Sequence, residues 1–400
     1  MVMENLKIYN TLSGKKEKFN TDDSDVGLYV CGITPYDTTH LGHAFTYTFF
    51  DVVHRYLKHQ GYNVTYVQNI TDVDEPLFSR AKKTGENWKE LAEKNSRIFF
   101  QDIEWLNNLK PDIVPKASEH IDDMIVFIEK IMKKGFAYES NGNVYFSIDL
   151  FKDYGELSKL PRDEMLPIAN QRGNNPDDKN KRNALDFVLW QSIKEEPFWK
   201  SPWSYGRPGW HIECSVMSMK YLGETIDIAG GGSDLIFPHH ESSIAQSEAV
   251  TGKQFVNCWM HTAMINYKGS KMSKKSGNLF FLDDLKNYDS NAVRLFLLSH
   301  PYKTEWEFNY KDIEKFSEQY ELFRKALNSE SEFEKKIDIS SFKNSFFNVM
   351  NDDFNIPKAI EILEFMSRSI IENPAYCKTN NAKSFLSEAL SILGLKPEYF

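Results

Sequence analysis

The chain has 400 residues, of which 41% are hydrophobic and 26% are charged. This balance is typical of a globular protein with two or three hydrophobic cores, and it excludes a disordered tail or a small disulfide-stapled module. The formal net charge of −9 disfavours nucleic acid as the main partner, since proteins that bind polyanions usually carry a basic excess, although an acidic protein can still carry a local basic groove.

The cysteines and the first residues of the chain indicate the compartment. The four cysteines lie far apart and form no dense disulfide framework, which is typical of a reducing cytosol; they are Cys31, Cys214, Cys258 and Cys377. Residues 1–7 contain no apolar signal core, and no uncharged run approaches the length that spans a membrane. We therefore expect a cytoplasmic protein without membrane contact.

The N-terminal part of the chain predicts a strand, a helix and a second strand. Residues 26–31 form a short apolar run that is typical of a buried strand, and residues 41–60 form a helical pattern that stops at Gly61. Residues 63–71 are rich in β-branched side chains and predict the next strand. Because two strands joined through a helix pair in parallel, we expect a parallel sheet with its site at the carboxyl ends of the strands.

Two further helices and an irregular segment follow. Apolar residues keep helical spacing over 88–109 and again over 121–132, and Gly135 supplies a stop for the second helix. Between about 155 and 207 the chain becomes polar and rich in proline and glycine. We expect this segment to be an insertion within the sheet domain.

The last part of the chain predicts one more strand and then helices. Residues 225–228 have strand character and are followed by a predicted glycine turn at 230–232, and the pattern is helical from about 283 onward. The patterns predict two domains: an α/β catalytic domain at 1–282, with an insertion at about 115–205 and a lysine-rich loop at 268–279, and a helical domain at 283–400.

Two short motifs could handle nucleotide phosphates. His40 and His43 flank a predicted strand-to-helix turn, where a helix N-terminus attracts anions, and Gly42 lets a flat ligand approach the backbone. The segment 269–278 places three lysines among serines and glycines, which suits charge that develops on departing pyrophosphate. Either motif alone is more often a solvated surface feature, but their joint occurrence favours nucleotidyl transfer.

A metal site could be assembled from distant segments. Cys31 ends the first strand and His239 follows the predicted glycine turn, so both can face one crevice together with Cys214. No local Cys-x-x-Cys spacing supports the site, and buried structural cysteines remain an alternative. Three sulfur and nitrogen ligands would suit tetrahedral zinc with one open position. A substrate thiolate could fill that position, and the metal bond would then reject serine.

Several strings of this sequence resemble the class I aminoacyl-tRNA synthetases, and in particular their cysteine-specific branch. The resemblance runs from about residue 6 to 320 and is carried by His40-Leu-Gly-His43, Lys271-Met-Ser-Lys274, the string at 206–214 and the string at 230–241. It implies a Rossmann-like parallel-sheet catalytic domain with an insertion, followed by a C-terminal helical bundle. The branch contains cysteinyl-tRNA synthetases and the cysteine:glucosaminyl-inositol ligases of mycothiol biosynthesis.

Details of the sequence are similar to the mycothiol ligases. The string that starts at Cys31 has their Cys-Gly-Ile-Thr-Pro form, Ser243 stands where the synthetases have a metal-binding glutamate, and residues 171–176 resemble a ligase-specific string. The end of the chain at Phe400 would leave little room for an anticodon-binding domain. We therefore expect L-cysteine:1D-myo-inositol 2-amino-2-deoxy-alpha-D-glucopyranoside ligase activity. Four residues depart from the ligase pattern: Gln171, Asn174, Asn175 and Lys275.

The resemblance implies an ATP-dependent, AMP-forming ligation through cysteinyl-adenylate, with one zinc ion per chain and Mg²⁺ bound to ATP. His40 and His43 would contact phosphates, Lys271 and Lys274 would stabilise pyrophosphate, and Cys31, Cys214 and His239 would bind zinc. Trp210 would pack on the substrate, Asp234 would pair with its ammonium group and Ile265 would lie near adenine. The implied adenylate pocket comprises Cys31, Gly32, Ile33, Thr34, Thr46, Asn69, Ile70, Thr71, Trp210, Gly232, Ser233, Asp234 and Ile265.

Three alternatives remain at this point. A cysteinyl-tRNA synthetase would form the same adenylate and pass cysteine to tRNA, but we expect a tRNA reader to carry a basic C-terminal surface, and residues 311–400 mix both signs of charge. A non-catalytic relative has no physical reason to retain both phosphate motifs. A zinc hydrolase lacks the His-Glu-x-x-His spacing that would supply its base.

Overall fold

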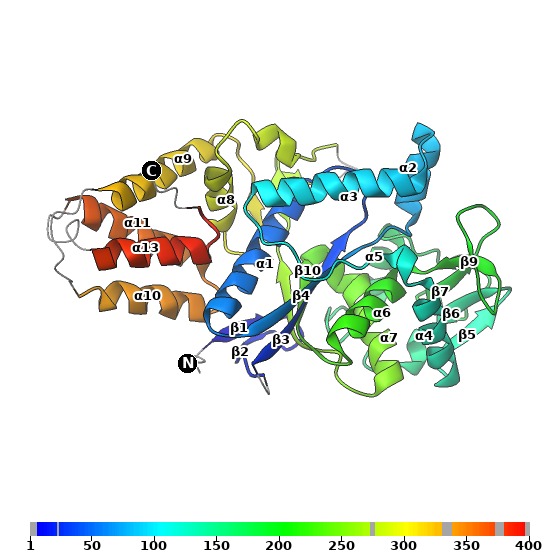
Figure 1. The fold of residues 1–400 in the computed structure, drawn as a ribbon. Helices are drawn as coiled ribbons and strands as arrows, with labels where there is room; N and C mark the ends of the chain where they lie inside the picture. The colour runs from blue at the N-terminus through cyan, green and yellow to red at the C-terminus, as the bar shows by residue number, and fades with distance from the viewer. Residues whose placement is uncertain (1–5, 22–23, 273–276, 330–337, 373–379, 397–400) are drawn as a thin grey trace.

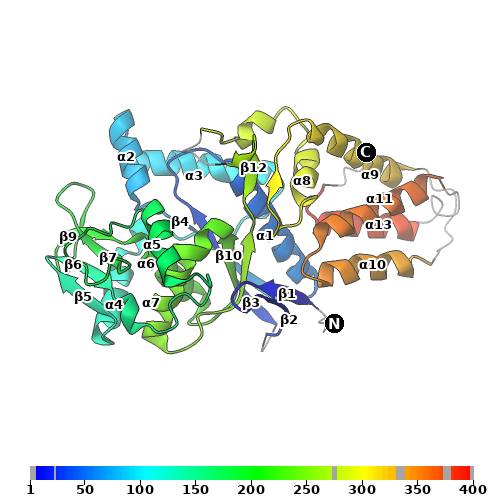
Figure 2. The same ribbon diagram turned by 180° about the vertical axis from the view of Figure 1, so that it is seen from behind.

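A parallel sheet forms the centre of the computed structural model, which describes residues 6–21, 24–272, 277–329, 338–372 and 380–396. A smaller antiparallel sheet with its own helices lies on one side of it, and a group of helices lies on the other (Figures 1 and 2). The α/β fold with a helical C-terminal region confirms the predicted fold class. Among the described residues, no helix is both long enough and apolar enough to cross a membrane.

The central sheet has four parallel strands in the order β11 (Val256–Thr262), β10 (Ile226–Gly232), β3 (Asp25–Ile33) and β4 (Asn63–Ile70). Helix α1 (Leu41–His59) connects β3 to β4, which confirms the predicted strand–helix–strand unit. Most of α1 is buried because it packs between the sheet and the C-terminal helices. The carboxyl ends of β3 and β10 and the N-terminus of α1 therefore meet at one edge of the sheet.

The predicted glycine turn at 230–232 is wrong, since these three residues form the end of strand β10. Gly230 lies so close to the neighbouring strand that a β-carbon there would stand 2.0 Å from the carbonyl oxygen of Met260. Glycine is required at this position by close backbone approach and not by a turn.

The predicted insertion contains a second sheet, which is antiparallel and has the strand order β5-β6-β7-β9-β8. Its strands are β5 (Ala137–Ser140), β6 (Asn143–Phe146), β7 (Phe187–Ser192), β8 (Trp199–Lys200) and β9 (Tyr205–Pro208). In the order of the chain, helix α5 (Arg162–Gln171) follows β6 and precedes β7. The polar segment after α5 is held on this sheet by side-chain hydrogen bonds, such as that from the hydroxyl of Tyr145 to Asp178, 2.6 Å long.

The remaining helices and short strands lie outside the C-terminal helical group. The helices are α2 (Glu75–Thr84), α3 (Trp88–Trp105), α4 (Ile121–Lys133), α6 (Trp210–Leu222) and α7 (Glu241–Thr251). The short strands are β1 (Lys7–Asn10), β2 (Lys15–Lys18), β12 (Ile265–Tyr267), β13 (Ser270–Lys271) and β14 (Trp306–Glu307). Helix α3 ends earlier than the sequence pattern predicts, because Asn107 adopts a positive φ of 63°.

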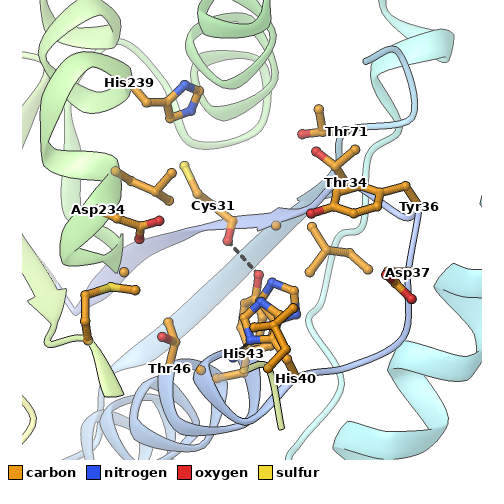
Figure 3. A pocket seen from close by; sticks show the side chains of 18 of the residues that line it. Cys31, Thr34, Tyr36, Asp37, His40, His43, Thr46, Thr71, Asp234 and His239 are labelled. Atoms are coloured by element: carbon orange, nitrogen blue, oxygen red, sulfur yellow. Dashed lines mark hydrogen bonds between the residues drawn. The ribbon is translucent and has the colours of Figure 1, made fainter. Parts of the chain in front are cut away.

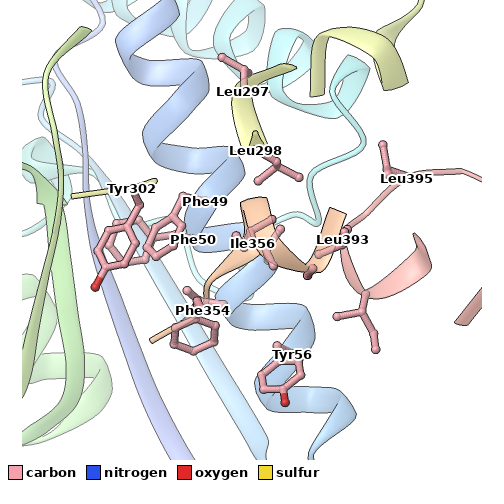
Figure 4. Packing of buried hydrophobic residues seen from close by; sticks show 14 of the residues in the cluster. Phe49, Phe50, Tyr56, Leu297, Leu298, Tyr302, Phe354, Ile356, Leu393 and Leu395 are labelled. Carbon is pink, nitrogen blue, oxygen red and sulfur yellow. The ribbon is translucent and has the colours of Figure 1, made fainter. Parts of the chain in front are cut away.

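The C-terminal helices share a core with α1. They are α8 (Ser290–Leu298), α9 (Asp312–Asn328), α10 (Ser340–Asn351), α11 (Ile356–Glu372) and α13 (Asn380–Ile392). Phe49 and Tyr56 of α1 lie in one hydrophobic cluster with Phe354, Ile356 and Leu393 (Figure 4). The helical end of the molecule is therefore packed directly on the helix whose N-terminus opens the central site.

Candidate active site

A pocket opens where β3 and β10 end and α1 begins (Figure 3). Cys31 and His239 lie at its base, Asp234 lies on one side, and Thr34 and Asp37 lie on the other. In parallel α/β folds, ligands bind in a crevice at the carboxyl ends of the strands, and this pocket lies at that edge of the sheet.

The structure brings the three predicted metal ligands together. One donor atom from each of Cys31, Cys214 and His239 lies within 4.8 Å of the others, and all three side chains are buried. The two sulfur atoms are 3.7 Å apart, and Nε2 of His239 lies 3.2 Å from the sulfur of Cys214. The chain therefore has a possible Cys/His metal site at the base of the pocket.

The two thiols are electrostatically unequal in the metal-free arrangement. The thiol of Cys31 donates to Cys214, and this hydrogen bond together with nearby His239 holds the pKa of Cys214 well below its usual value. Burial raises the pKa of Cys31. Thiolates are the form that binds metals, so Cys214 is the residue of the two that is already prepared as a ligand.

Two further histidines, His211 and His240, contact the candidate metal ligands. His239 lies with its Nδ1 atom 3.0 Å from Nδ1 of His211, which burial keeps neutral by lowering its pKa. Nε2 of His240 lies 3.0 Å from the sulfur of Cys31. Because a metal-binding histidine usually donates its other N–H to a partner, His211 would hold the ring of His239 in place when Nε2 binds a metal.

A hydrogen-bonded chain runs from Cys31 to the first loop of the protein. Nδ1 of His240 lies 2.8 Å from Nε2 of His261, and Nδ1 of His261 lies 2.8 Å from the hydroxyl of Thr11. Burial lowers the pKa of both histidines, that of His261 to about 3, so each ring carries one proton. When Nε2 of His240 donates to the sulfur of Cys31, Nδ1 of His240 accepts from Nε2 of His261, and Nδ1 of His261 accepts from the hydroxyl of Thr11. The sequence did not reveal this chain, because its members come from four separate segments.

The two histidines of the first motif form one unit at the start of α1. Their rings are stacked with centroids 3.6 Å apart, and Nδ1 of His40 accepts the backbone N–H of His43, 3.2 Å away. The ring of His43 packs against Phe99, and burial together with the neighbouring imidazole of His40 lowers the pKa of His43 well below the usual value. His43 is therefore neutral near pH 7 and can donate a hydrogen bond without adding a buried charge.

Residues that follow the lysine motif lie beside these histidines. Lys271 is exposed on β13 and is not among the residues that line the pocket, whereas Lys274 and Lys275 lie outside the described residues. The chain then returns over the histidine motif, where the backbone N–H of Leu41 donates to the carbonyl of Phe280, 2.9 Å away. The segment with the lysines therefore ends next to the start of α1, and two residues that follow it line the pocket directly, Leu279 and Phe281.

Most of the predicted adenylate residues line this pocket. They are Cys31, Gly32, Ile33, Thr34, Thr46, Thr71, Trp210, Gly232, Asp234 and Ile265. Asn69, Ile70 and Ser233 are not among the lining residues. Asn69 is fully buried behind the pocket, where it accepts hydrogen bonds from Tyr29 and from the backbone N–H of Gly32 and donates to Thr71. Its side chain positions lining residues and does not reach the pocket itself.

Sequence reasoning missed several lining residues. They include Tyr36, Thr38, Tyr47, Leu235, Ala263 and Met264. The hydroxyl of Tyr47 donates to the carbonyl of Cys31 over 2.9 Å, which fixes the end of β3 on α1. Tyr47 stands within the long apolar pattern of α1, where an aromatic residue looks like any other core residue. Only the fold therefore identifies it as part of the site.

Gly32 is required by the way β3 approaches β4 at the pocket. A β-carbon at this position would stand 1.5 Å from the backbone carbonyl oxygen of Asn69, a separation that no side-chain movement can relieve. We expect Gly32→Ala to separate the two strand ends, to lower the free energy of unfolding by about 2 kcal/mol or more and to remove most activity. Urea unfolding and an activity assay would measure both effects.

Gly27→Ala is the matched control on the same strand. A β-carbon there would meet Leu222 at 3.4 Å, which is ordinary contact, and the position is remote from the pocket. We expect it to leave activity unchanged. Equal behaviour of the two variants would contradict the role of Gly32.

Comparison with known proteins identifies the family. Residues 18–318 match the family described as tRNA synthetases class I (C) catalytic domain. A Cysteine--tRNA ligase of Thermococcus gammatolerans is 42% identical over an alignment of 419 positions, gaps included, that covers 99% of this chain and 87% of that protein. The chain belongs to the cysteinyl-tRNA synthetase family. A Cysteine--tRNA ligase of Haemophilus influenzae is also 42% identical, over an alignment of 404 positions and with the same coverage.

Solved structures agree with the fold of this family. A methionyl-tRNA synthetase of Mycobacterium tuberculosis in complex with methionyl-adenylate covers 92% of the chain with a TM-score of 0.68 and 13% identity, and the match covers 89% of that structure. A putative arginyl-tRNA synthetase of Campylobacter jejuni covers 93% of the chain, and the match covers 93% of that structure, with a TM-score of 0.61 and 15% identity. At these identities the likeness concerns the fold alone. As a member of the cysteinyl-tRNA synthetase family, the chain is an ATP-dependent ligase.

The predicted assignment to the mycothiol ligases, with glucosaminyl-inositol as the acceptor, is wrong. The relatives named above align over 99% of the chain and are named Cysteine--tRNA ligases. The residues that suggested otherwise have local structural roles. Ser243 is an example, since its hydroxyl donates to the carbonyl of His239 at 2.9 Å. Contacts of this kind carry no information about the acceptor.

Proposed function

We propose that this chain activates L-cysteine with ATP and transfers the cysteinyl group to tRNA. The observation that carries the proposal is the convergence of Cys31, Cys214 and His239 at the base of a pocket that His40 and His43 also line. The three donor atoms suit a metal that binds thiolates, and the nearby start of α1 suits phosphate. Together they fit a substrate that has a thiol at one end and, at the other, a carboxylate that becomes adenylated. The names of the relatives support tRNA as the acceptor.

The donor set fits zinc. With bonds of about 2.3 Å to sulfur and about 2.0 Å to nitrogen, tetrahedral geometry separates two sulfur ligands by about 3.8 Å and a sulfur from a nitrogen ligand by about 3.5 Å. The corresponding distances here are 3.7 Å between Cys31 and Cys214 and 3.2 Å between Cys214 and His239. Ser243 is engaged with the carbonyl of His239. When bound, zinc would supply an open position for the cysteine thiolate, which serine cannot match.

The side chains around the metal ligands would orient the amino acid. The ring of Trp210 stacks on His239 with centroids 4.2 Å apart, so it can cover the substrate side chain and restrict water. The carboxylate of Asp234 lies on the same side of the pocket as Cys31 and can bind the substrate ammonium group (Figure 3). With sulfur and ammonium held, the carboxylate of cysteine would point towards the start of α1.

The start of α1 would hold ATP, which binds as its Mg²⁺ complex. The cysteine carboxylate attacks the α-phosphate, forming cysteinyl-adenylate and releasing pyrophosphate. His40 and His43 would donate to phosphate oxygens, and Lys271 and Lys274 would stabilise the charge on pyrophosphate. A ribose hydroxyl at the 3′ end of tRNA then attacks the activated carbonyl, and AMP leaves. No protein nucleophile is needed, because positioning and charge stabilisation carry both steps.

Two further statements belong to this proposal. Residues 1–282 would form the catalytic part and residues 283–400 the helical part, which is supported by the change from sheets to helices near α8. A cytoplasmic location fits three buried cysteines that are free among the described residues. The proposal is tested by charging tRNA for cysteine with purified protein, ATP and labelled cysteine. Formation of cysteinyl-tRNA supports it, and cysteine-dependent ATP–pyrophosphate exchange without transfer to tRNA contradicts the acceptor.

Substitutions of His40 separate its two roles. Asparagine can replace the cap that His40 provides to α1 but not the imidazole that faces the pocket. We expect His40→Asn to lower kcat for ATP–pyrophosphate exchange about 10²-fold with little change in stability, and His40→Ala to lose in addition about 1 kcal/mol of stability. Exchange kinetics and thermal unfolding measure the two effects. Full exchange activity in His40→Asn would contradict the phosphate role.

A further inference from the structure

An arginine from outside the catalytic sheet reaches the side of the pocket that would bind the substrate ammonium group. Arg172 follows helix α5 directly, and its Nη1 atom lies 3.4 Å from Oδ2 of Asp234. Asp234 belongs to the short turn Ser233–Leu235 after β10, and α5 packs against the segment that follows this turn. The contact therefore joins the antiparallel-sheet side of the molecule to the pocket.

Asp234 is the carboxylate that would lie near the ammonium group of an amino acid whose sulfur is bound at the metal site. The acidic side chains that line the pocket within the described ranges are Asp37 and Asp234. Figure 3 shows Asp234 beside Cys31, whereas Asp37 lies on the opposite side and beyond Thr34. The ammonium group of cysteine is two bonds from the carbon that carries the sulfur, so Asp234 is the better placed of the two carboxylates to bind it.

The pairing with Arg172 is weak enough to be exchanged. The side chains of Arg172 and Asp234 are 33% and 27% exposed, and one nitrogen faces one oxygen in place of a two-point contact. Ion pairs of this kind contribute little because water screens them. Because Arg172 directly follows helix α5, its guanidinium stays beside the carboxylate of Asp234. The guanidinium therefore competes with the substrate ammonium group for this carboxylate.

We infer that Arg172 occupies Asp234 in the empty enzyme and that the ammonium group of the substrate displaces it. The inference rests on the proposed function only for cysteine as the amino acid that is activated. With a competitor inside the protein, the apparent affinity equals the intrinsic affinity multiplied by the fraction of molecules in which the carboxylate is available. Arg172 thus sets the concentration of cysteine at which the enzyme works, without contributing to the chemical step.

Removal of the guanidinium tests the exchange. We expect Arg172→Ala to lower the KM for cysteine in ATP–pyrophosphate exchange about two- to fivefold with unchanged kcat. Arg172→Lys retains the competing charge and should stay close to the wild type. Arg162→Ala, in the first turn of the same helix and exposed, is the matched control and should change neither constant.

A double-mutant cycle shows whether the effect passes through Asp234. We expect Arg172→Ala to leave the KM of an Asp234→Asn variant unchanged, because no carboxylate remains to be competed for. A raised or unchanged KM in Arg172→Ala, or an equal shift in both backgrounds, would overturn the inference and indicate a structural role. Absence of cysteine-dependent exchange in the wild type would instead overturn the proposed function.

Discussion

Cys214→Ser is expected to remove both the bound metal and the ability to activate cysteine. The residue supplies one of three buried donor atoms at the base of the pocket, and its pKa is already lowered by Cys31 and His239. A hydroxyl is a poor ligand for zinc, so the variant should bind less than about one-tenth of the wild-type metal. We expect kcat/KM for cysteine-dependent ATP–pyrophosphate exchange to fall about 10³-fold or more. Metal analysis and exchange kinetics measure the two losses.

Cys258→Ser is the control for this substitution. Cys258 is a free, buried cysteine on β11, in the hydrophobic cluster that includes α1, and it does not line the pocket. The same chemical change there should cost some stability and leave metal content and kcat unchanged. A metal-free Cys214→Ser protein with full activity would show that the three donor atoms serve only the fold.

Arg294→Met is expected to give the largest loss of stability. Arg294 is fully buried on α8 and donates to the carbonyl oxygens of Leu393 and Leu106, 2.7 and 2.8 Å away, to Asn108 at 2.6 Å, and to Asp51 of α1. Its removal leaves Asp51 with Arg55 as its remaining cation and takes the guanidinium donors away from the oxygens of Leu393, Leu106 and Asn108. The free energy of unfolding should fall by about 3–5 kcal/mol, as measured by urea denaturation.

An exposed arginine provides the comparison. Arg368 on α11 pairs with Glu364 one turn earlier, and its side chain is 54% exposed. Arg368→Met should change the free energy of unfolding by less than about 0.5 kcal/mol. If Arg294→Met were equally mild, the helical end would not depend on the buried contact between α8, α1 and the segment after α13.

The sequence predicted the parts of the fold that are local. The strand–helix–strand unit from Asp25 to Ile70 has the expected periodicities, and its carboxyl edge carries Cys31 and His40 as predicted. The antiparallel sheet of the insertion could not be predicted in the same way. Its strands are short and its loop is polar, so they are specified by contacts such as Tyr145 to Asp178 that no periodic pattern reveals.

Only those residues of the candidate site that lie within recognisable sequence motifs could be predicted. Cys31 was predicted from its place at the end of a strand and His239 from a glycine turn that proves to be strand, and the supporting chain through His261 to Thr11 joins segments 250 residues apart. The acceptor was misjudged for a related reason. Cysteine ligases and cysteinyl-tRNA synthetases form the same cysteinyl-adenylate and use the same kinds of residues to form it. A single local difference such as Ser243 therefore does not identify the acceptor of the cysteinyl group.

X-ray absorption at the zinc edge tests the central claim most directly. We expect two sulfur ligands and at least one nitrogen ligand in the zinc-loaded protein, from Cys31, Cys214 and His239. Addition of cysteine should increase the number of sulfur ligands to about three, whereas addition of serine should not. A spectrum that is unchanged by cysteine would contradict the claim that this site selects the substrate by its sulfur.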